Sequence, residues 1–325
     1  MFGDILGVLF SFQGVLLLIV LVLTLYITCN LFCDVRVADL EKKAVLITGC
    51  DSGFGYELAK KLDALGLRVF AACLTSEGEA KLTKECSREL RTFKLDVTKD
   101  GDVQKALEVV KSGLPSQGLW AVVNNAGISF PGMIEWQTVE EMKRVVDVNV
   151  WGMVSVTRAF LPLLKRTKGR VVNIASCLGR VAIRGAAAYC ISKFSVQAFS
   201  DTLRREMPHF GVTVHIIEPG FFKTNITDTK TTVQRIEALW ENLDANTKES
   251  YGIEYFEKGK KIYLIFISRW LKSPNIYKVV NALTHAVTST RPKLRYVIGW
   301  DHKIFWRTLS YLPSEIQDKV LGLLL

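Results

Sequence analysis

The chain has 325 residues, 49% of them hydrophobic, so it is long enough to bury one large core. We therefore expect one domain of roughly 250 residues with an additional tail segment. Its 42 Lys and Arg residues against 32 Asp and Glu residues give a net charge of +10. These bases are dispersed and form no run with interleaved aromatic residues, which argues against nucleic acid as a partner. Seven cysteines at irregular spacing predict neither a disulfide framework nor a metal site.

The N-terminal segment is strongly apolar. Residues 5–33 contain no charged side chain, and residues 14–26 are almost continuous Leu, Val and Ile. About 20 apolar residues suffice to cross a bilayer. A cleavable signal peptide is the alternative, but the start has no Lys or Arg, carries Asp4, and leads into a run that is too long. We therefore predict an N-terminal transmembrane helix, a membrane anchor over residues 1–35.

Basic residues follow this predicted anchor. Arg36, Lys42 and Lys43 lie after it, whereas no basic side chain precedes it. The positive-inside rule then favours the cytosolic side for the rest of the chain, residues 36–325. Acidic residues among these bases reduce the excess of positive charge on which this prediction depends. We expect a single-pass protein of the endoplasmic reticulum membrane.

A glycine-rich turn follows a short apolar strand at residues 44–47. Residues 48–55 read Thr-Gly-Cys-Asp-Ser-Gly-Phe-Gly, and a helical pattern of leucines follows them. A strand, a glycine-rich turn and a helix start together direct backbone N–H groups and the helix dipole at a pyrophosphate. The spacing is G-x-x-x-G-x-G rather than G-x-G-x-x-G, so a purely structural turn is the alternative.

Strands and helices alternate through the middle of the chain. Helical patterns separate the apolar runs, and no internal repeat or low-complexity linker interrupts them. This alternation predicts an α/β fold, a doubly wound parallel sheet of the Rossmann type with right-handed crossovers. Besides the first strand, the expected strands lie at residues 68–73, 92–97, 119–123, 170–175 and 212–217.

A tyrosine and a lysine stand four residues apart, at Tyr189 and Lys193, which places both on one face of a helix. A phenol with a pKa near ~10 is a poor proton carrier at neutral pH, and a nearby ammonium group favours the phenolate. Ser176 follows an apolar run, so we expect it at the carboxyl end of a buried strand, where ligands collect in open α/β sheets. These residues predict an acid–base site if the chain also supplies a cofactor site.

Aromatic residues accumulate where the alternation stops, between residues 221 and 271. Such an insertion suits a lid over an apolar ligand, and packing of a C-terminal subcore is the alternative. The tail, residues 306–325, predicts either an amphipathic helix on the membrane or ordinary packing. The aromatic residues are Trp240, Tyr251, Tyr255, Phe256, Tyr263 and Phe266.

Taken in order, these motifs resemble those of the short-chain dehydrogenase/reductase family over residues 42–306. The residues within these motifs resemble those of one branch of the family. This branch includes membrane-bound retinol dehydrogenases, 3α- and 17β-hydroxysteroid dehydrogenases and 3-hydroxybutyrate dehydrogenase. The resemblance implies an enzyme that transfers a hydride between an alcohol and a nicotinamide cofactor. The motifs that carry it are residues 48–55 and 124–127, Asn149, Ser176, Tyr189, Lys193, Pro219 and Gly220.

The resemblance implies four catalytic residues. Tyr189 would exchange a proton with the alcohol or carbonyl oxygen of the substrate. Lys193 would lower the pKa of this tyrosine and bind the nicotinamide ribose, and Ser176 would hold the substrate oxygen beside Tyr189. Asn149 would anchor a water that links Lys193 to solvent; a side chain that caps or kinks a helix is the alternative for this residue.

The resemblance also implies cofactor contacts. The glycine turn would surround the pyrophosphate, two residues after the third strand would contact the adenine, and the Asn-Asn-Ala-Gly run would border the adenosine ribose. Residues after the sixth strand would meet the carboxamide or a phosphate. Together with Tyr189 and Lys193, the implied contacts are Gly49, Asp51, Ser52, Gly53, Phe54, Gly55, Asp96, Val97, Asn124, Ala126, Gly127, Pro219, Gly220 and Thr224.

The residues after the second strand favour NAD over NADP. Cys73, Leu74 and Thr75 stand where a ribose-binding Asp or Glu is expected, and no Arg replaces it to hold a 2′-phosphate. Asp51, inside the glycine turn, would repel that phosphate.

The anchor and the aromatic lid favour a lipophilic secondary or allylic alcohol, a retinol or a hydroxysteroid, as substrate. One alternative is 3-hydroxybutyrate, because the spacing between Ser176 and Tyr189 resembles that of the hydroxybutyrate-type members. A catalytically silent family member that acts as a binding protein is the other alternative. The family's habit of forming dimers or tetramers implies a homo-oligomer.

Overall fold

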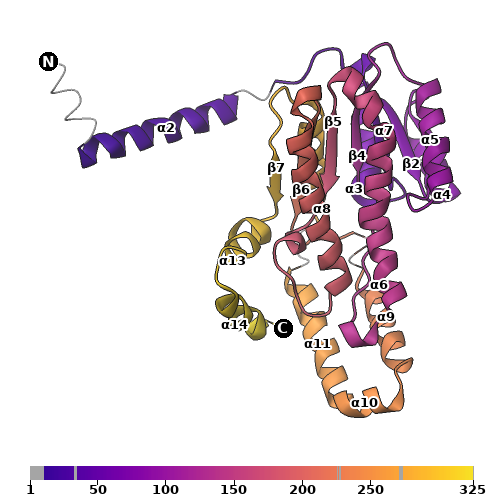
Figure 1. Cartoon of the computed structure of the whole chain (residues 1–325), viewed down its shortest axis with the longest axis vertical. Coiled ribbons are helices and arrows are strands. Elements are labelled where there is room, and N and C mark those ends of the chain that lie inside the picture. The colour runs from indigo at the N-terminus through magenta and orange to yellow at the C-terminus, as the bar shows by residue number, and fades with distance from the viewer. Residues whose placement is uncertain (1–10, 33–34, 225, 227, 271–273, 325) are drawn as a thin grey trace.

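The computed structural model describes residues 11–32, 35–224, 226, 228–270 and 274–324. At its centre lies a parallel sheet of seven strands in the order β3-β2-β1-β4-β5-β6-β7 (Figure 1). This order reverses direction between β1 and β4, the point at which doubly wound sheets bind ligands. The strands are β1 (Ala44–Thr48), β2 (Arg68–Cys73), β3 (Arg91–Lys94), β4 (Leu119–Asn124), β5 (Arg170–Ile174), β6 (Thr213–Pro219) and β7 (Arg295–Ile298).

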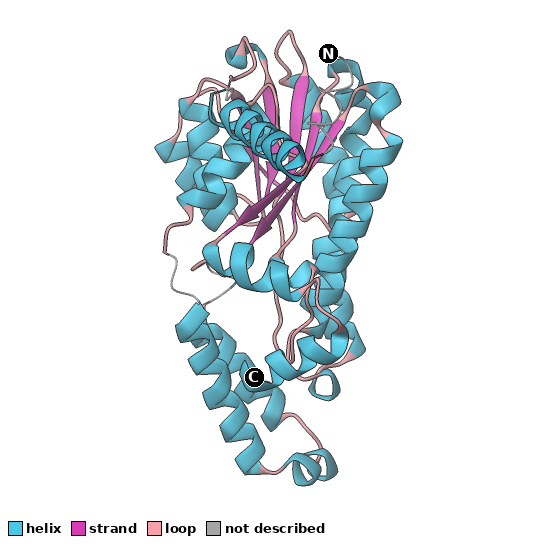
Figure 2. Ribbon diagram, turned by 90° about the vertical axis from the view of Figure 1, so that its left-hand side faces the viewer, coloured by secondary structure: helices cyan, strands magenta, loops and turns pink. Residues whose placement is uncertain are grey.

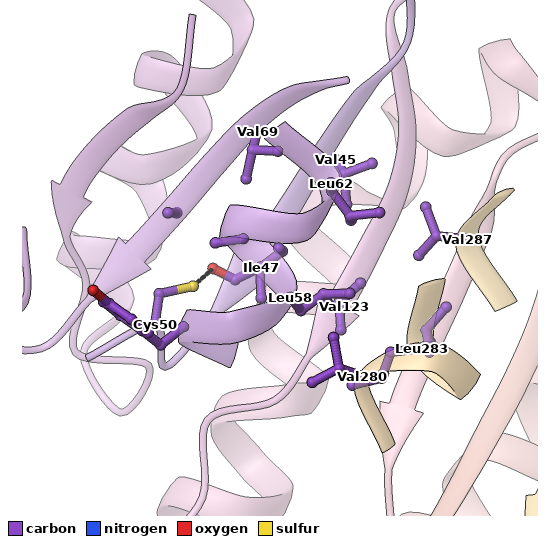
Figure 3. Close-up of a cluster of buried hydrophobic side chains, with 14 of the residues drawn as sticks. Val45, Ile47, Cys50, Leu58, Leu62, Val69, Val123, Val280, Leu283 and Val287 are labelled. Atoms are coloured by element: carbon purple, nitrogen blue, oxygen red, sulfur yellow. Dashed lines mark hydrogen bonds between the residues drawn. The ribbon is translucent and has the colours of Figure 1, made fainter. Parts of the chain in front are cut away.

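Helices cover both faces of this sheet, as the alternating pattern predicts (Figure 2). On one face Leu58 and Leu62 of α3 pack with Val45 and Ile47 of β1 (Figure 3). On the other face α5, α7 and α8 cover the sheet, with Phe160 of α7 fully buried. Because both faces are covered, the central strands are continuous apolar runs. These helices are α3 (Gly53–Ala64), α4 (Ser76–Glu85), α5 (Asp100–Ser112), α6 (Val139–Val146), α7 (Met153–Thr167), α8 (Ala187–Glu206) and α12 (Tyr277–Thr288).

The sheet contains one strand more than the sequence predicted. After α12 the chain enters β7, which pairs with β6 in parallel, so that Ile216 lies opposite Arg295. The burial of β7 alternates along its four residues between partly buried and buried. The strand therefore contains no long apolar run, which is the pattern that predicted the other strands. The parallel doubly wound sheet is confirmed, with this additional crossover unit.

Residues 221–271, the predicted lid, fold largely as helices beyond the carboxyl ends of the strands (orange in Figure 1). Their aromatic side chains form a cluster in which the rings of Trp240 and Phe256 stack with centroids 4.7 Å apart. Trp136 packs edge-on against Trp240 at 5.5 Å, which joins this cluster to the segment before α6. The lid helices are α9 (Thr229–Glu241), α10 (Ala245–Tyr251) and α11 (Ile253–Trp270).

The two ends of the chain add further helices. Near the N-terminus, α2 (Phe12–Phe32) projects away from the sheet, and α13 (Arg307–Leu309) and α14 (Ser314–Leu324) form the C-terminal part (Figure 1). Among the residues that the structure describes, no helix combines the length and the hydropathy needed to cross a membrane. The predicted anchor therefore finds no confirmation here, and its residues 1–10 and 33–34 lie outside the described part.

Candidate active site

The glycine turn lies between the end of β1 and the start of α3. Gly49 and Gly53 have φ angles of +70° and +65°, a backbone conformation that favours glycine. A Cβ atom on Gly49 would lie 2.7 Å from Ala126 Cα, and one on Gly55 would lie 2.5 Å from the Gly49 oxygen. At these glycine positions the backbone of the turn therefore packs directly against the loop after β4 or against the turn itself, with no room for a side chain.

Two side chains that the sequence did not single out hold this turn in place. The Thr48 hydroxyl accepts hydrogen bonds from the backbone N–H groups of Asn125 and Ala126, both at 3.1 Å. The Asn125 amide donates to the carbonyl oxygens of Thr48 and Gly49, both at 2.8 Å. Asn125 belongs to the Asn-Asn-Ala-Gly run, so the motif itself was the available signal.

Asn124 lies on the other side of its strand. Its amide donates to Thr157 Oγ1 at 2.9 Å and to Asn173 Oδ1 at 2.8 Å, within the buried layer between β4, β5 and α7. Its oxygen Oδ1 is buried without a hydrogen-bond partner among the described residues. The side chain expected at the adenosine ribose therefore braces the sheet, while Ala126 borders the turn and Gly127 lies beside Asn149.

Asp51 reaches from the glycine turn to the end of β2. Its carboxylate accepts hydrogen bonds from the backbone N–H groups of Leu74 at 2.8 Å and Thr75 at 2.9 Å, and from the Thr75 hydroxyl at 2.7 Å. The carboxylate thus lies at the strand end where a ribose-binding acid is expected and missing from the sequence. Ser52, next to Asp51, is the N-cap residue of α3 and makes no side-chain capping bond.

Asp96 and Val97 follow β3, as expected. Asp96 accepts hydrogen bonds from the Thr98 backbone at 3.1 Å and the Thr98 hydroxyl at 2.7 Å. Burial raises the pKa of Asp96, but the hydrogen bonds from Thr98 and Lys99 outweigh this effect and hold the pKa below its usual range. Val97 is buried against Gly152, where a Cβ would lie 2.6 Å from Val97 Cγ2.

Ser176, Tyr189 and Lys193 come together at the carboxyl end of β5. Ser176 begins a short helical turn after this strand and is hydrogen-bonded to Tyr189. Lys193 Nζ lies 5.5 Å from the centre of the Tyr189 ring and donates to the Ile174 carbonyl at 2.9 Å. The helix α8 carries both residues on one face, as the four-residue spacing predicts.

Burial changes the proton affinities of this group. It raises the pKa of the Tyr189 phenol, and the hydrogen bond with Ser176 opposes that effect. Burial also lowers the pKa of Lys193 from 10.5 to about 8. A protonated Tyr189 is the form that donates a proton to a carbonyl, whereas alcohol oxidation requires its phenolate.

Asn149 lies in a π-helical segment, Asp147–Gly152, between α6 and α7. Its side chain accepts from the Ile128 N–H at 2.8 Å and donates to the Ile128 carbonyl at 2.9 Å and to Ser192 Oγ at 2.9 Å. Ser192 in turn donates to the Tyr189 carbonyl at 2.7 Å. Asn149 thus marks a local change of helix type and connects with the Tyr189 helix, while its role in holding a water stays a prediction.

The residues after β6 close the other side of the site. The Gly220 N–H donates to the Ile298 carbonyl at 2.7 Å, and a Cβ on Gly53 would lie 3.9 Å from the Thr224 side chain. Phe54 of the turn packs edge-on against Phe222, with ring centroids 6.1 Å apart. The glycine turn and the loop that begins at Pro219 therefore face each other.

A buried ion-pair network, which the sequence did not reveal, supports this loop. Glu218, fully buried before Pro219, accepts from Arg180 Nε at 2.7 Å and Nη2 at 3.0 Å, and from Arg295 Nη1 at 2.5 Å. Arg180 follows the Ser176 turn, and Arg295 also pairs with Asp201 of α8. These charges come from distant parts of the sequence, so no local pattern announces them.

An apolar pocket lies under the lid, with about 600 Å³ of space including its mouth. Tyr263 lines this pocket and packs on the same apolar cluster as Tyr189. Gly185, on the loop before α8, is also part of the wall. Tyr189 itself is not part of the lining; Tyr263 connects the pocket to the apolar cluster on which Tyr189 packs, and further walls come from Trp136, Ile236 and Phe256.

The residues at the switch between β1 and β4 fit a dinucleotide cofactor. The backbone of the turn lies where side chains would collide, and it leads into the N-terminus of α3, which favours phosphate. Asp51 supplies an acceptor at the end of β2 for a ribose hydroxyl. Within the described part of the chain, no group of side chains has the composition of a metal site.

Comparison with known proteins agrees with this geometry. The family model described as short chain dehydrogenase matches residues 43–235. The mouse protein named short-chain dehydrogenase/reductase family 9C member 7 is 46% identical, over 90% of this chain and 92% of the relative. Human 17-beta-hydroxysteroid dehydrogenase type 6 and rat retinol dehydrogenase 7 are each 45% identical, over 88% of this chain and 89% of each relative.

Solved structures share the fold at lower identity. A short chain dehydrogenase/reductase from Burkholderia phymatum in complex with NAD matches with a TM-score of 0.69 and 21% identity, covering 88% of this chain and 97% of its own. A short chain dehydrogenase from Burkholderia cenocepacia in complex with NADP has a TM-score of 0.64 and 19% identity, covering 86% and 96%.

Proposed function

We propose that this chain, which belongs to the short-chain dehydrogenase family, oxidises a lipophilic secondary or allylic alcohol, a hydroxysteroid or a retinol. The chain is a nicotinamide-dependent alcohol dehydrogenase by family, and its substrate class is the proposal. The observation that carries this proposal is the pocket under the lid, whose apolar and aromatic wall includes Tyr263, which packs on the same cluster as Tyr189. An apolar wall of this kind favours a lipophilic substrate over 3-hydroxybutyrate. The names of the human and rat relatives, a hydroxysteroid dehydrogenase and a retinol dehydrogenase, support the same choice.

The catalytic roles are part of this proposal. Bound nicotinamide supplies the hydride acceptor. Tyr189 takes the proton of the substrate hydroxyl, and Ser176 holds the substrate oxygen; the hydrogen bond between the two side chains supports this pairing. Lys193, when charged, favours the Tyr189 phenolate and offers its N–H groups to the ribose. Asn149 connects to the Tyr189 helix through Ser192, which holds the lysine side of the site in place.

NAD is the proposed cofactor, in preference to NADP. The Asp51 carboxylate at the end of β2 supports this choice, because it accepts hydrogen bonds from hydroxyls and repels a 2′-phosphate. Gly49, Ser52, Gly53 and Gly55 would surround the pyrophosphate. The further proposed contacts are Phe54, Asp96, Val97, Asn124, Ala126, Gly127, Tyr189, Lys193, Pro219, Gly220 and Thr224, with Asn124 acting through the sheet.

We further propose that residues 1–35 attach the protein to the endoplasmic reticulum membrane. The side chains from Val15 to Leu23 are apolar and each at least 44% exposed, so burial in lipid would remove them from water. The exposed Trp151, Ile191 and Phe194 support a homo-oligomer. Alkaline carbonate extraction of membranes tests the first proposal, and sedimentation of the detergent-solubilised full chain tests the second.

NADH formation by membranes that contain the full chain tests the proposed function. Retinol, a 3α-hydroxysteroid, a 17β-hydroxysteroid and 3-hydroxybutyrate are offered in parallel, each with NAD and with NADP. Tyr189→Phe should lower turnover at least about 100-fold, because it removes the proton carrier. Tyr251→Phe is the matched control, since Tyr251 belongs to the lid and its hydroxyl donates to Glu135 of the segment before α6 at 2.8 Å. Turnover of 3-hydroxybutyrate alone, or equal loss in both variants, would refute the proposal.

A further inference from the structure

We infer that the substrate carries a second oxygen, a carbonyl or a carboxylate at the end remote from its reacting hydroxyl, which accepts hydrogen bonds from Arg184. This inference rests on the proposed function and narrows its substrate class. It distinguishes an oxygenated lipid such as an oxo-steroid from retinol, whose remote end is hydrocarbon.

The charges of the pocket under the lid are the first observation. Two basic side chains line this otherwise apolar wall, Arg184 and Lys260. Lys260 is paired with Glu237 at 3.1 Å and with Glu257 at 3.0 Å. Arg184 has no carboxylate within ion-pair distance among the described residues. The wall therefore presents one cation that protein carboxylates leave uncompensated within the described part of the chain.

The surroundings of Arg184 are the second observation. Its Nη2 donates to the Tyr255 hydroxyl at 2.5 Å, and its guanidinium lies 5.0 Å from the centre of that ring. A guanidinium has five N–H donors in a fixed plane, and Tyr255 accepts from one of them. Arg184 is exposed at the rim of the pocket, and contact with Tyr255 of α11 orients its guanidinium there. An oriented guanidinium suits a carbonyl or carboxylate better than a freely moving ammonium group does.

The distance along the chain is the third observation. Arg184 precedes Tyr189 by five residues, which span at most about 18 Å even when fully extended. The loop between them is fixed, because the Gly132 N–H donates to the Gly185 carbonyl at 2.9 Å and Gly185 has a φ angle of +75°. In this inference both side chains contact one elongated lipid, with its hydroxyl at Tyr189 and its remote oxygen at Arg184.

The energetics favour an oxygen at this position over hydrocarbon. Covering a guanidinium with hydrocarbon removes water from its N–H groups without replacing the lost hydrogen bonds. An oxygen acceptor restores them, and hydrogen bonds to charged groups are among the strongest in proteins. The pocket wall thus selects a ligand that is apolar in its middle and polar at both ends.

Two pairs of 3α-hydroxysteroids test this inference with the full-length protein. One pair is an androstane with and without a 17-oxo group, and the other is a cholane with and without a terminal carboxylate. Arg184→Met removes the donors and keeps the length of the side chain. We expect kcat/KM for an oxygenated member to fall about tenfold or more, mainly through KM, while that for its hydrocarbon partner changes less than about twofold. The pair that shows this loss identifies the remote group.

Tyr255→Phe and Arg184→Lys separate substrate recognition from lid closure. If Arg184 acts only by holding α11, both Arg184→Met and Tyr255→Phe will lower kcat/KM equally for all four steroids, which overturns the inference. So does an unchanged kcat/KM for both pairs. Arg184→Lys should restore part of the discrimination for a carboxylate, since it keeps the charge.

Binding measurements keep the inference separate from the proposed function. Calorimetry of the protein with NAD and each steroid gives affinities without any turnover. Selective loss of oxygenated ligands in Arg184→Met supports the inference even if no alcohol is oxidised, in which case the proposed function fails alone. Equal affinities within each pair, together with normal turnover, would overturn the inference alone.

Discussion

The two walls of the active site are held together by different interactions. The cofactor wall, residues 48–55 and 124–127, is backbone against backbone, tied by the Thr48 hydroxyl and the Asn125 amide. The lid wall, α9 to α11, consists of side chains from helices that contact each other through aromatic rings and ion pairs near the surface. A wall made of backbone fits a ligand of one shape. A wall made of side chains can come to prefer another ligand when residues are substituted, while its helices stay in place.

This difference predicts how the two walls respond to substitution. In the cofactor wall a change of a single atom meets backbone or a buried charge. In the lid a similar change meets a partly exposed side chain that can move. The following five predictions compare buried positions in and around the cofactor wall with exposed ones, from the largest expected effect to the smallest.

Glu218→Gln should destabilise the protein most. Glu218 is fully buried and accepts hydrogen bonds from Arg180 and Arg295, so its loss removes the carboxylate that these two arginines share and leaves Arg295 with Asp201. Loss of one partner of a buried ion pair costs about 3–5 kcal/mol, and urea unfolding measures it. Asp201→Asn is the matched control, because Asp201 pairs with Arg295 but is 24% exposed. Equal effects of both variants would contradict the contrast.

The stabilisation of the fold by the Glu218 carboxylate and its two arginines should decrease at low pH. Burial raises the pKa of Glu218, but Arg180 and Arg295 outweigh it and hold the pKa below 4.5. Because the folded-state pKa is the lower one, the carboxylate stabilises the fold above pH 4.5 and this contribution is lost as the pH falls through the folded value. The difference in unfolding free energy between wild type and Glu218→Gln should therefore be constant near neutral pH and shrink below pH 4.5.

Gly49→Ala should be the second most harmful substitution. Its Cβ would lie 2.7 Å from Ala126 Cα at a φ of +70°, so backbone must shift. The left-handed conformation costs about 1–2 kcal/mol, and overpacking adds about 1–3 kcal/mol. Gly252→Ala is the control in the lid, with a φ of +77° and no atom within 4 Å of its Cβ. We expect weaker NAD binding by calorimetry for Gly49→Ala only, and unchanged binding would refute the rigid-wall interpretation.

Much of the cofactor wall was predictable because its signal is local. The Thr-Gly-Cys-Asp-Ser-Gly-Phe-Gly turn predicts a phosphate site because a strand precedes it and a helix follows it, and Tyr189 with Lys193 predicts one helix face. The orientation of Asn124 was not predictable in the same way. It depends on which face of β4 the strand pleat assigns to this residue, and the bonds to Thr157 and Asn173 come from distant segments.

Contacts between segments that are distant in the sequence could not be predicted from local sequence patterns. Glu218 contacts Arg180 and Arg295 through tertiary structure, and β7 is a four-residue strand whose burial alternates. The lid aromatics allowed two interpretations, a ligand wall or a packed subcore. Each has support, because Phe256 both stacks on Trp240 and lines the pocket.

Lys193→Met should raise stability at neutral pH while it removes activity. Burial lowers the pKa of Lys193 from 10.5 to about 8, so the unfolded chain holds this proton more tightly than the fold does. The stability of the wild type relative to the variant should therefore rise with pH between about 8 and 10.5, by up to about 3 kcal/mol. Urea unfolding of both proteins at pH 7 and pH 10 measures this difference, and a constant gap would contradict it.

Glu237→Gln in the lid should have the smallest effect on stability. Glu237 pairs with Lys260 at 3.1 Å and is 43% exposed, and Lys260 keeps its contact with Glu257. Exposed ion pairs of this kind contribute about 0–1 kcal/mol, so urea unfolding should change by less than that. Removal of one carboxylate nevertheless leaves the pocket more positive, which should strengthen the binding of a carboxylate-ended steroid and leave its hydrocarbon partner unaffected. A loss of stability larger than about 1 kcal/mol would contradict the interpretation that the lid tolerates such a change.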